Sequence, residues 1–157
     1  HIMSHQFIGK EDGAWIYVLM SGTDINRFKV GKTTQHPVKR MKDIRTGDPT
    51  LALQVAYFVP ALLDIKLGVL ESAIHHQLAA TVGRISFYDE AVSEWFHGDA
   101  RNAWYELDMI FEEFEFTVTN HYQPGQNKIV RFWGADMEAE YPLRFNLYNC
   151  DNGEIDF

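Results

Sequence analysis

The stretch Ala14-Trp15-Ile16-Tyr17-Val18-Leu19-Met20 is apolar, aromatic and β-branched, and this composition predicts a buried β-strand. A turn that contains glycine, aspartate and asparagine follows over residues 21–26. Residues 27–31 predict a short second strand, whose alternation places two basic side chains on one face and two apolar ones on the other. Two strands joined by a short turn indicate an antiparallel hairpin.

Beyond the hairpin, helical and strand patterns alternate along the chain. Pro37 suits the first turn of a helix, because its missing N–H would have no helical partner there. Asp64 suits the cap of a second helix, because its carboxylate can accept from free N–H groups of the first turn. The predicted elements are a helix from Pro37 to about Gly47, a strand over 51–59, a helix from Asp64 to about Ala80, a helix over 100–114, and short strands over 128–133 and 143–149.

This order of elements predicts an α/β or α+β fold. We expect a small central antiparallel sheet of three strands flanked by helices, followed by a β-rich, acidic C-terminal extension. A chain of 157 residues suits one compact domain with an extension. We divide it into an N-terminal lead with a tag remnant over residues 1–12, a domain over 13–116 and the extension over 117–157.

The composition narrows the class of protein. Hydrophobic residues make up 46% and aromatic residues 14% of the chain, which favours a packed core over disorder. Cys150 is the only cysteine, so an internal disulfide framework and a cysteine-based zinc cluster are excluded. No apolar run approaches the roughly 20 residues of a membrane span, and no signal-peptide pattern is present. We therefore expect a cytoplasmic protein with no membrane partner.

The charge is unevenly distributed, although the whole chain carries a net charge of −8. Residues 23–47 contain seven basic and two acidic side chains, a net charge of +5. Residues 101–157 contain four basic and eleven acidic side chains, a net charge of −7. The basic segment could face phosphate groups while the extension stays away from them, and ordinary solvated surface is an equally good interpretation of both.

Several short motifs together resemble a known superfamily. Trp15-Ile16-Tyr17 is followed by a turn, then by Lys29-Val30-Gly31-Lys32-Thr33, and then by Arg40 in the next predicted helix. This order and spacing resemble the GIY-YIG nuclease superfamily. No single motif is specific, but their order along the chain is.

The resemblance is greater to one branch, which is named after a bacteriophage T5 open reading frame and is also called the meiotically up-regulated type. That branch typically carries a Lys-Ile-Gly-Lys-Thr box, a Glu-x-x-x-His pair and a closing Glu-Trp-Phe. The corresponding residues are Lys29–Thr33, Glu71 with His75, and Glu94-Trp95-Phe96. The resemblance covers residues 14–98 and leaves the C-terminal extension outside.

The resemblance implies a GIY-YIG-like fold and hydrolysis of phosphodiester bonds in DNA, with RNA as the less favoured substrate. It assigns Glu71 to hold a divalent cation, Arg40 to stabilise the phosphoryl group and Tyr17 to activate water. The residue types suit these roles. Mg²⁺ (or Mn²⁺) prefers oxygen ligands, and the planar guanidinium of arginine matches phosphate. Tyrosine acts as a base only if the metal and nearby cations lower its pKa from about 10.

The remaining candidates carry more than one interpretation. Lys29 stands where the superfamily has its second tyrosine, which indicates either a variant mechanism or a domain that binds without cutting. His75 shares a helix face with Glu71 and is expected to relay protons, contact phosphate or serve a structural role. We expect all the catalytic candidates on one exposed face of the sheet, with Glu94-Trp95-Phe96 closing the core. Expected nucleic-acid contacts are Arg27, Lys32, Thr33, Lys39, Lys42 and Arg45.

The acidic extension is the expected site for contacts outside the catalytic domain. It is predicted to bind a protein partner, to contact a second copy of the chain in a homo-oligomer, or to fold back onto the basic segment as an autoinhibitor.

Overall fold

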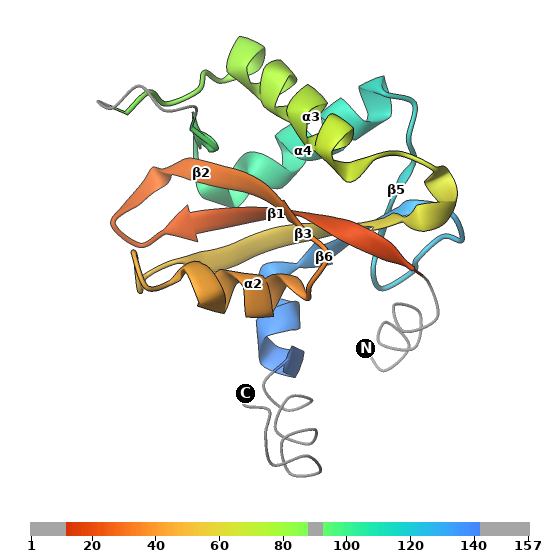
Figure 1. Cartoon of the computed structure of the whole chain (residues 1–157), viewed down its shortest axis with the longest axis horizontal. Coiled ribbons are helices and arrows are strands. Elements are labelled where there is room, and N and C mark those ends of the chain that lie inside the picture. The colour runs from red at the N-terminus through yellow and green to blue at the C-terminus, as the bar shows by residue number, and fades with distance from the viewer. Residues whose placement is uncertain (1–11, 88–92, 142–157) are drawn as a thin grey trace.

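The computed structural model describes residues 12–87 and 93–141, and within this part six strands form one mixed sheet (Figure 1). The strand order across the sheet is β4-β2-β1-β3-β6-β5. The strands are β1 Gly13–Ser21, β2 Asp24–Thr33, β3 Ala52–Pro60, β4 Trp95–His97, β5 Val118–Asn120 and β6 Ile129–Trp133. The α+β architecture predicted from the order of elements is thereby confirmed.

The centre of the sheet is the hairpin that the sequence predicted. β1 pairs antiparallel with β2 on one side and with β3 on the other. Tyr17 stands opposite Gly31 in β2 and opposite Ala56 in β3. β2 is longer than the predicted strand over residues 27–31, because ladder pairing with β1 continues to Thr33.

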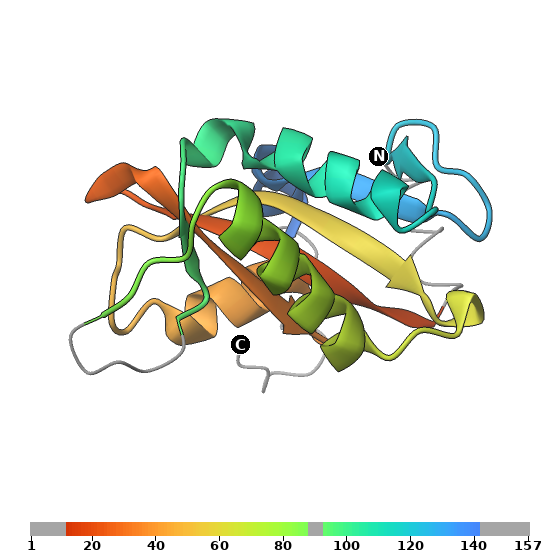
Figure 2. The ribbon, with the colours of Figure 1, turned by 90° about the horizontal axis from the view of Figure 1, so that it is seen from above.

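Helices cover both faces of the sheet. α3 (Leu67–Thr81) and α4 (Ala103–Glu113) lie on one face, where they contact each other, and α2 (Pro37–Ile44) lies on the opposite face (Figures 1 and 2). A further helix over residues 134–141 follows β6 on the α2 face. Both faces of β1 are therefore buried, which explains its unbroken apolar sequence.

Two core clusters follow from the alternation of side chains along β1. Ile16 and Val18 join the cluster beneath α3 and α4. Trp15, Tyr17 and Leu19 join the cluster beneath α2. The face of Tyr17 is thereby set by its position in the strand, because successive side chains point to opposite sides of a sheet.

The predicted start of one helix is confirmed, and the predicted start of another is wrong. α2 starts at Pro37 as predicted, and the Nδ1 of His36 accepts from the N–H of Val38 at 3.2 Å. The prediction that Asp64 caps the next helix is wrong. Asp64 adopts a φ of 55° at the end of a short 3₁₀ turn, and α3 begins three residues later without a side-chain cap.

The prediction of a three-stranded sheet is also wrong, because β4 pairs with β2 and β6 pairs with β3. β5 then pairs parallel with β6 at the outer edge. Ile129 and Val130 are fully buried, so residues of the extension complete the hydrophobic core on that side.

The extension is less rich in strand than expected, since β6 is followed by the helix over 134–141, whose Met137 is 5% exposed. The strand predicted over 143–149 lies outside the described residues. Across residues 12–87 and 93–141, no helix combines the length and the apolar character needed to cross a lipid bilayer.

Candidate functional site at the edge of β2

Tyr17 is positioned by a glycine on the neighbouring strand. A Cβ atom placed on Gly31 would lie 2.5 Å from the hydroxyl oxygen of Tyr17 and 2.6 Å from its Cζ. The phenol ring therefore crosses the backbone of Gly31 and points from β1 over β2. Tyr17 is only 2% exposed, so its hydroxyl is held in one place by packing.

Arg40 meets the hydroxyl of Tyr17 from helix α2. Val38 and Met41 bury one side of this helix against the sheet, and half-buried Arg40 forms a side-chain hydrogen bond with Tyr17. The guanidinium can only donate, because it has no acceptor, so the phenol oxygen accepts. Residues 17 and 40, which are far apart in the predicted elements, thus form one polar group.

Glu71 approaches the same strand from helix α3 on the other face. It is 8% exposed, and its Oε1 lies 3.3 Å from the Nζ of Lys32. The Nε2–H of His75 donates to the carbonyl of Val30 at 2.9 Å and lies 3.9 Å from Oε2 of Glu71. His75 thereby attaches α3 to β2 directly beside the carboxylate.

The edge of β2 is open where these groups approach. β4 pairs only with Arg27, Phe28 and Lys29, and within the described residues no strand pairs with positions 31–33 on that side. The charge of Glu71 acts on the Tyr17 hydroxyl and helps to raise its pKa. The carboxylate and the phenol are therefore electrostatically coupled across the strand.

The expectation that all candidates share one exposed face of the sheet is wrong. Tyr17, Lys29 and Arg40 lie on the α2 face, whereas Glu71 and His75 come from the α3 face. Alternation in β2 separates the two groups, because Val30 points into the α3 cluster. The two groups reach neighbouring residues of β2 from opposite faces: the Tyr17 ring crosses Gly31, and Glu71 pairs with Lys32.

Glu94 belongs to this group although sequence reasoning assigned it to the core. Phe96 is fully buried as expected, but Oε1 of Glu94 lies 2.5 Å from Nζ of Lys29. The backbone carbonyl of Glu94 also accepts from the N–H of Val30 at 3.0 Å. The only sequence signal was the position of Glu94 at the start of the closing box, because its neighbours on β2 are more than sixty residues away.

The pKa of Tyr17 reflects these opposing charges. Burial is the largest influence and raises the pKa above 10.0. The hydrogen bond and charge of Arg40 lower it, and the carboxylates of Glu94 and Glu71 raise it. The net effect is a raised pKa, so Tyr17 is a neutral phenol at pH 7 until further positive charge enters the site.

Comparison with protein families identifies the family of the chain. A family described as the T5orf172 domain matches residues 14–115. The chain belongs to the T5orf172 domain family. This family is related to the GIY-YIG domains, and the matched range contains all the catalytic candidates while the extension after residue 116 lies outside it. No curated protein and no solved structure matches the chain.

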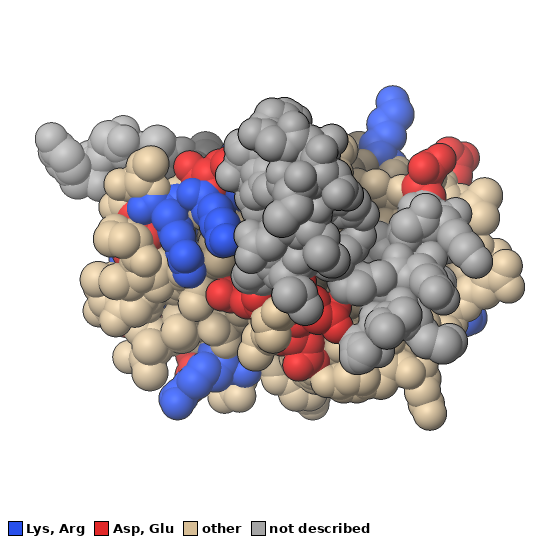
Figure 3. Space-filling view, turned by 90° about the horizontal axis from the view of Figure 1, so that it is seen from below, with Lys and Arg blue, Asp and Glu red and all other residues tan. Residues whose placement is uncertain are grey.

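The other basic candidates of this T5orf172 domain are spread over the surface around the site. Figure 3 looks onto the α2 face and shows Lys and Arg side chains in separate groups with acidic side chains between them. Arg45 is used structurally, because its guanidinium donates twice to the carbonyl of Leu51, at 2.8 and 3.0 Å.

The remaining expected nucleic-acid contacts also have neighbours in the fold. Two cations lie over aromatic rings: Arg27 is 4.8 Å from the ring centroid of Trp95, and Lys42 is 5.5 Å from that of Tyr141. Two lysines form ion pairs: Lys32 pairs with Glu71, and Nζ of Lys39 lies 3.7 Å from Oδ2 of Asp43. The Oγ1 of Thr33 accepts a hydrogen bond from the N–H of Gln35.

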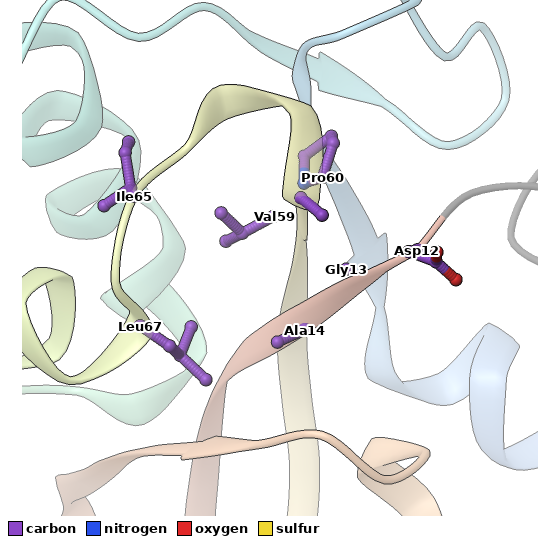
Figure 4. Close-up of a pocket in the computed structure, with 8 residues that line it drawn as sticks. Asp12, Gly13, Ala14, Val59, Pro60, Ile65 and Leu67 are labelled. Atoms are coloured by element: carbon purple, nitrogen blue, oxygen red, sulfur yellow. The ribbon is translucent and has the colours of Figure 1, made fainter.

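Two surface pockets differ in chemistry. One of about 230 Å³ lies beside the site and is lined by Lys29, Arg40, Ile44, Gly47, Asp48, Leu51 and Trp95. The other, of about 320 Å³, lies where β1 begins and β3 ends (Figure 4). Apolar side chains such as Val59, Ile65 and Leu67 surround it, and the carboxylate of Asp12 points away. Only the smaller pocket presents the cations that a phosphate requires.

The T5orf172 domain has one carboxylate suited to a hard cation at the site. Among the described residues, no group of three or more His, Cys, Asp or Glu side chains could hold a metal ion. Mg²⁺ keeps most of its waters and needs one or two carboxylates, so nearly buried Glu71 at an open strand edge fits that ion.

Proposed function

We propose that this T5orf172 domain is a metal-dependent endonuclease that hydrolyses phosphodiester bonds in DNA. The observation that carries the proposal is the approach of three groups to neighbouring residues of β2: the Tyr17 phenol beside the Arg40 guanidinium at Gly31, and the Glu71 carboxylate at Lys32. The three come from three separate elements. Relationship to the GIY-YIG domains supports the same conclusion, since that relationship implies a nuclease.

Each group has a role that follows from its chemistry. Glu71 would hold Mg²⁺ (or Mn²⁺), the ion that nucleases of this superfamily generally use. Bound there, the cation would neutralise charge on the phosphoryl oxygens. Arg40 binds a phosphoryl oxygen and stabilises the charge that develops in the transition state.

Tyr17 takes a proton from the attacking water as the phenolate, after its own hydroxyl proton has left to solvent. This role requires the pKa of Tyr17 to fall, because burial and two carboxylates hold it above its usual value. Arg40 already opposes them, and positive charge beside Glu71 would cancel a second contribution. A cation at Glu71 would thereby lower the pKa of Tyr17 and favour the phenolate, so proton transfer should depend on the metal.

Lys29 and His75 support the reacting groups. The short ion pair with Glu94 fixes the Lys29 ammonium on the phosphate-facing side of β2. His75 donates to the carbonyl of Val30 and borders Glu71, so we assign it to positioning the carboxylate rather than to proton transfer. The acidic extension is proposed as the contact surface for a protein partner or a second copy of the chain.

A non-catalytic module that binds nucleic acid or a protein is the second candidate. The observation in its favour is the ion pair of Lys29 with Glu94, which places a fully engaged cation where the superfamily has a second tyrosine. Such a module would bind DNA and leave it intact in the presence of any divalent ion.

The deciding experiment measures cleavage of labelled DNA with Mg²⁺ for the parent and for Glu71→Gln. The variant keeps the size of the side chain and removes the charge that holds the cation, so cleavage should be lost. Arg40→Ala should lower the rate by about 10²–10³-fold. Glu112→Gln, an exposed position on α4, is the matched control and should cut like the parent.

Two results would overturn the proposal. Cleavage by Glu71→Gln at the parental rate would remove the carboxylate from the mechanism. DNA binding by the parent without cleavage in Mg²⁺ or Mn²⁺ would favour the binding module.

A further inference from the structure

The pocket of about 230 Å³ beside Arg40 has a mixed lining that phosphate alone does not explain. Lys29 and Arg40 form a cationic side that it shares with the proposed catalytic site. Ile44, Leu51 and the indole of Trp95 are apolar and cannot bind a phosphate. A ligand that fits both sides carries an anionic group and a flat apolar group within a few ångströms of each other.

We propose that this pocket binds one unpaired nucleobase of the DNA strand, next to the phosphate held by Arg40. The inference rests on the proposed function for the phosphate and adds the substrate class, which is a single-stranded or locally unpaired nucleotide. The pocket of about 230 Å³ is smaller than the sites of about 300–1,000 Å³ that hold whole small-molecule ligands, which suits one base better than a base pair. Enzymes that read a single base place it in a comparable recess lined by aromatic and apolar side chains.

Trp95 is the expected stacking surface in this pocket. Its Cα stands opposite Lys29 across the β2–β4 pair, so the indole and the ammonium lie on the same face. The guanidinium of Arg27 lies 4.8 Å from the centroid of its ring and holds the indole in place. A rigid aromatic ring beside two cations is the arrangement by which proteins bind single strands, through stacking on the base and charge on the backbone.

Asp48 gives the pocket a preference among bases. Its Oδ2 accepts from the hydroxyl of Ser21 at 2.6 Å, and its Oδ1 accepts from the N–H and hydroxyl of Thr50 at 2.9 and 2.5 Å. A carboxylate has about four acceptor positions, so one remains on Oδ2. The bonds from Ser21 and Thr50 hold the pKa of Asp48 below its usual value. A charged acceptor favours bases with an exocyclic amino group, such as cytosine, over thymine.

Gly47 allows the pocket to be filled without disturbing the fold. A Cβ on Gly47 meets no atom within 4 Å, and the same is true of Gly68 in the first turn of α3. Because Gly47 lines the pocket, Gly47→Phe adds a ring to that lining, whereas Gly68→Phe adds the same ring at a position that does not line it. Thermal unfolding of both variants, compared with the parent, verifies that they fold.

The test measures fluorescence anisotropy of a labelled oligocytidylate of about eight nucleotides, and of the same strand with abasic sites throughout, in EDTA. Gly47→Phe should weaken binding of the oligocytidylate about tenfold, since one stacked base contributes about that factor. Binding of the abasic strand should be unchanged. Gly68→Phe should leave both affinities at the parental value. Ile44→Phe, which enlarges another lining side chain, should act like Gly47→Phe.

Several outcomes would contradict the proposal. If Gly47→Phe weakened binding of the normal and the abasic strand equally, the added ring would be obstructing the backbone of the strand and not a base. No weakening of either strand would show that no base enters. Equal affinities of the parent for oligocytidylate and oligothymidylate would remove the role of Asp48. Because the assay excludes metal, a base-specific effect without any cleavage in Mg²⁺ would support the pocket while refuting the nuclease.

Discussion

Replacement of Gly31 by alanine tests the geometry that positions Tyr17. Gly31 has an ordinary negative φ, so space alone and not backbone conformation requires glycine there. The new methyl group would lie 2.5 Å from the Tyr17 hydroxyl, and ordinary contact requires at least 3.4 Å. The phenol must therefore move by about 0.9 Å (3.4 − 2.5) away from its place beside Arg40.

This displacement has two consequences of predictable size. Overpacking in a filled core costs about 1–3 kcal/mol of unfolding free energy. Replacing glycine also lowers the entropy of the unfolded chain, which stabilises the folded state by about 0.4–1 kcal/mol. A net destabilisation of roughly 1–2 kcal/mol remains. A misplacement of about 1 Å in a catalytic group can reduce the rate about 10²-fold. Cleavage should thus fall much further than stability alone would explain.

Urea unfolding of a double-mutant cycle isolates the contact. Gly31→Ala is combined with Tyr17→Val, which keeps a β-branched residue in β1 but has no ring to reach Gly31. In that background the alanine should be neutral or slightly stabilising, which gives a coupling of about 1–3 kcal/mol between the positions. Gly47→Ala, where a Cβ meets open space, serves as control. A coupling near zero would refute the placement of the Tyr17 ring across Gly31.

Three further predictions follow from the same structure. Glu94→Gln should release Lys29 for phosphate, so that binding to single-stranded DNA tightens and the slope of log K against log salt steepens by about 0.7; an unchanged slope would argue against that role. Burial raises the folded-state pKa of Tyr17 and Tyr57 above 10.0, so the contribution of these two tyrosines to the unfolding free energy should be constant below pH 10 and fall at higher pH. Tyr57→Phe should reduce this alkaline loss in urea titrations, and an identical loss would contradict it. A chain ending at residue 116 should fail to fold by circular dichroism, because Ile129 and Val130 fill the core.

Local patterns predicted the centre of the fold correctly. The unbroken apolar run of β1, the turn after it and Pro37 at the start of α2 each depend on neighbouring residues only. The resemblance to the GIY-YIG superfamily then indicated which side chains to compare, and the structure brings Tyr17 and Arg40 into contact. These features could be predicted because each is indicated by a short motif with a defined spacing of residues.

Pairing between residues far apart in the chain could not be predicted from such local patterns. The predictions missed that β6 pairs with β3 and that Glu94 lies beside Lys29, because neither pairing leaves a periodic signal in the sequence. The single-face expectation for the site failed for a related reason. The alternation along β2 indicated which face each of its residues occupies. It did not indicate that Glu71 would pair with Lys32 where β2 has no partner strand on one side.

The charges at the edge of β2 explain how such a site remains folded before a cation binds. Glu71 and Glu94 each have a lysine within 3.3 Å, so neither carboxylate is left without a counter-charge. The two lysines differ: the side chain of Lys29 is 20% exposed, whereas that of Lys32 is 45% exposed. The ammonium of Lys32 is therefore the one that can turn to solvent if a divalent cation takes its place at Glu71. The freed ammonium would then lie beside the phosphate, and binding of metal and binding of DNA would favour each other.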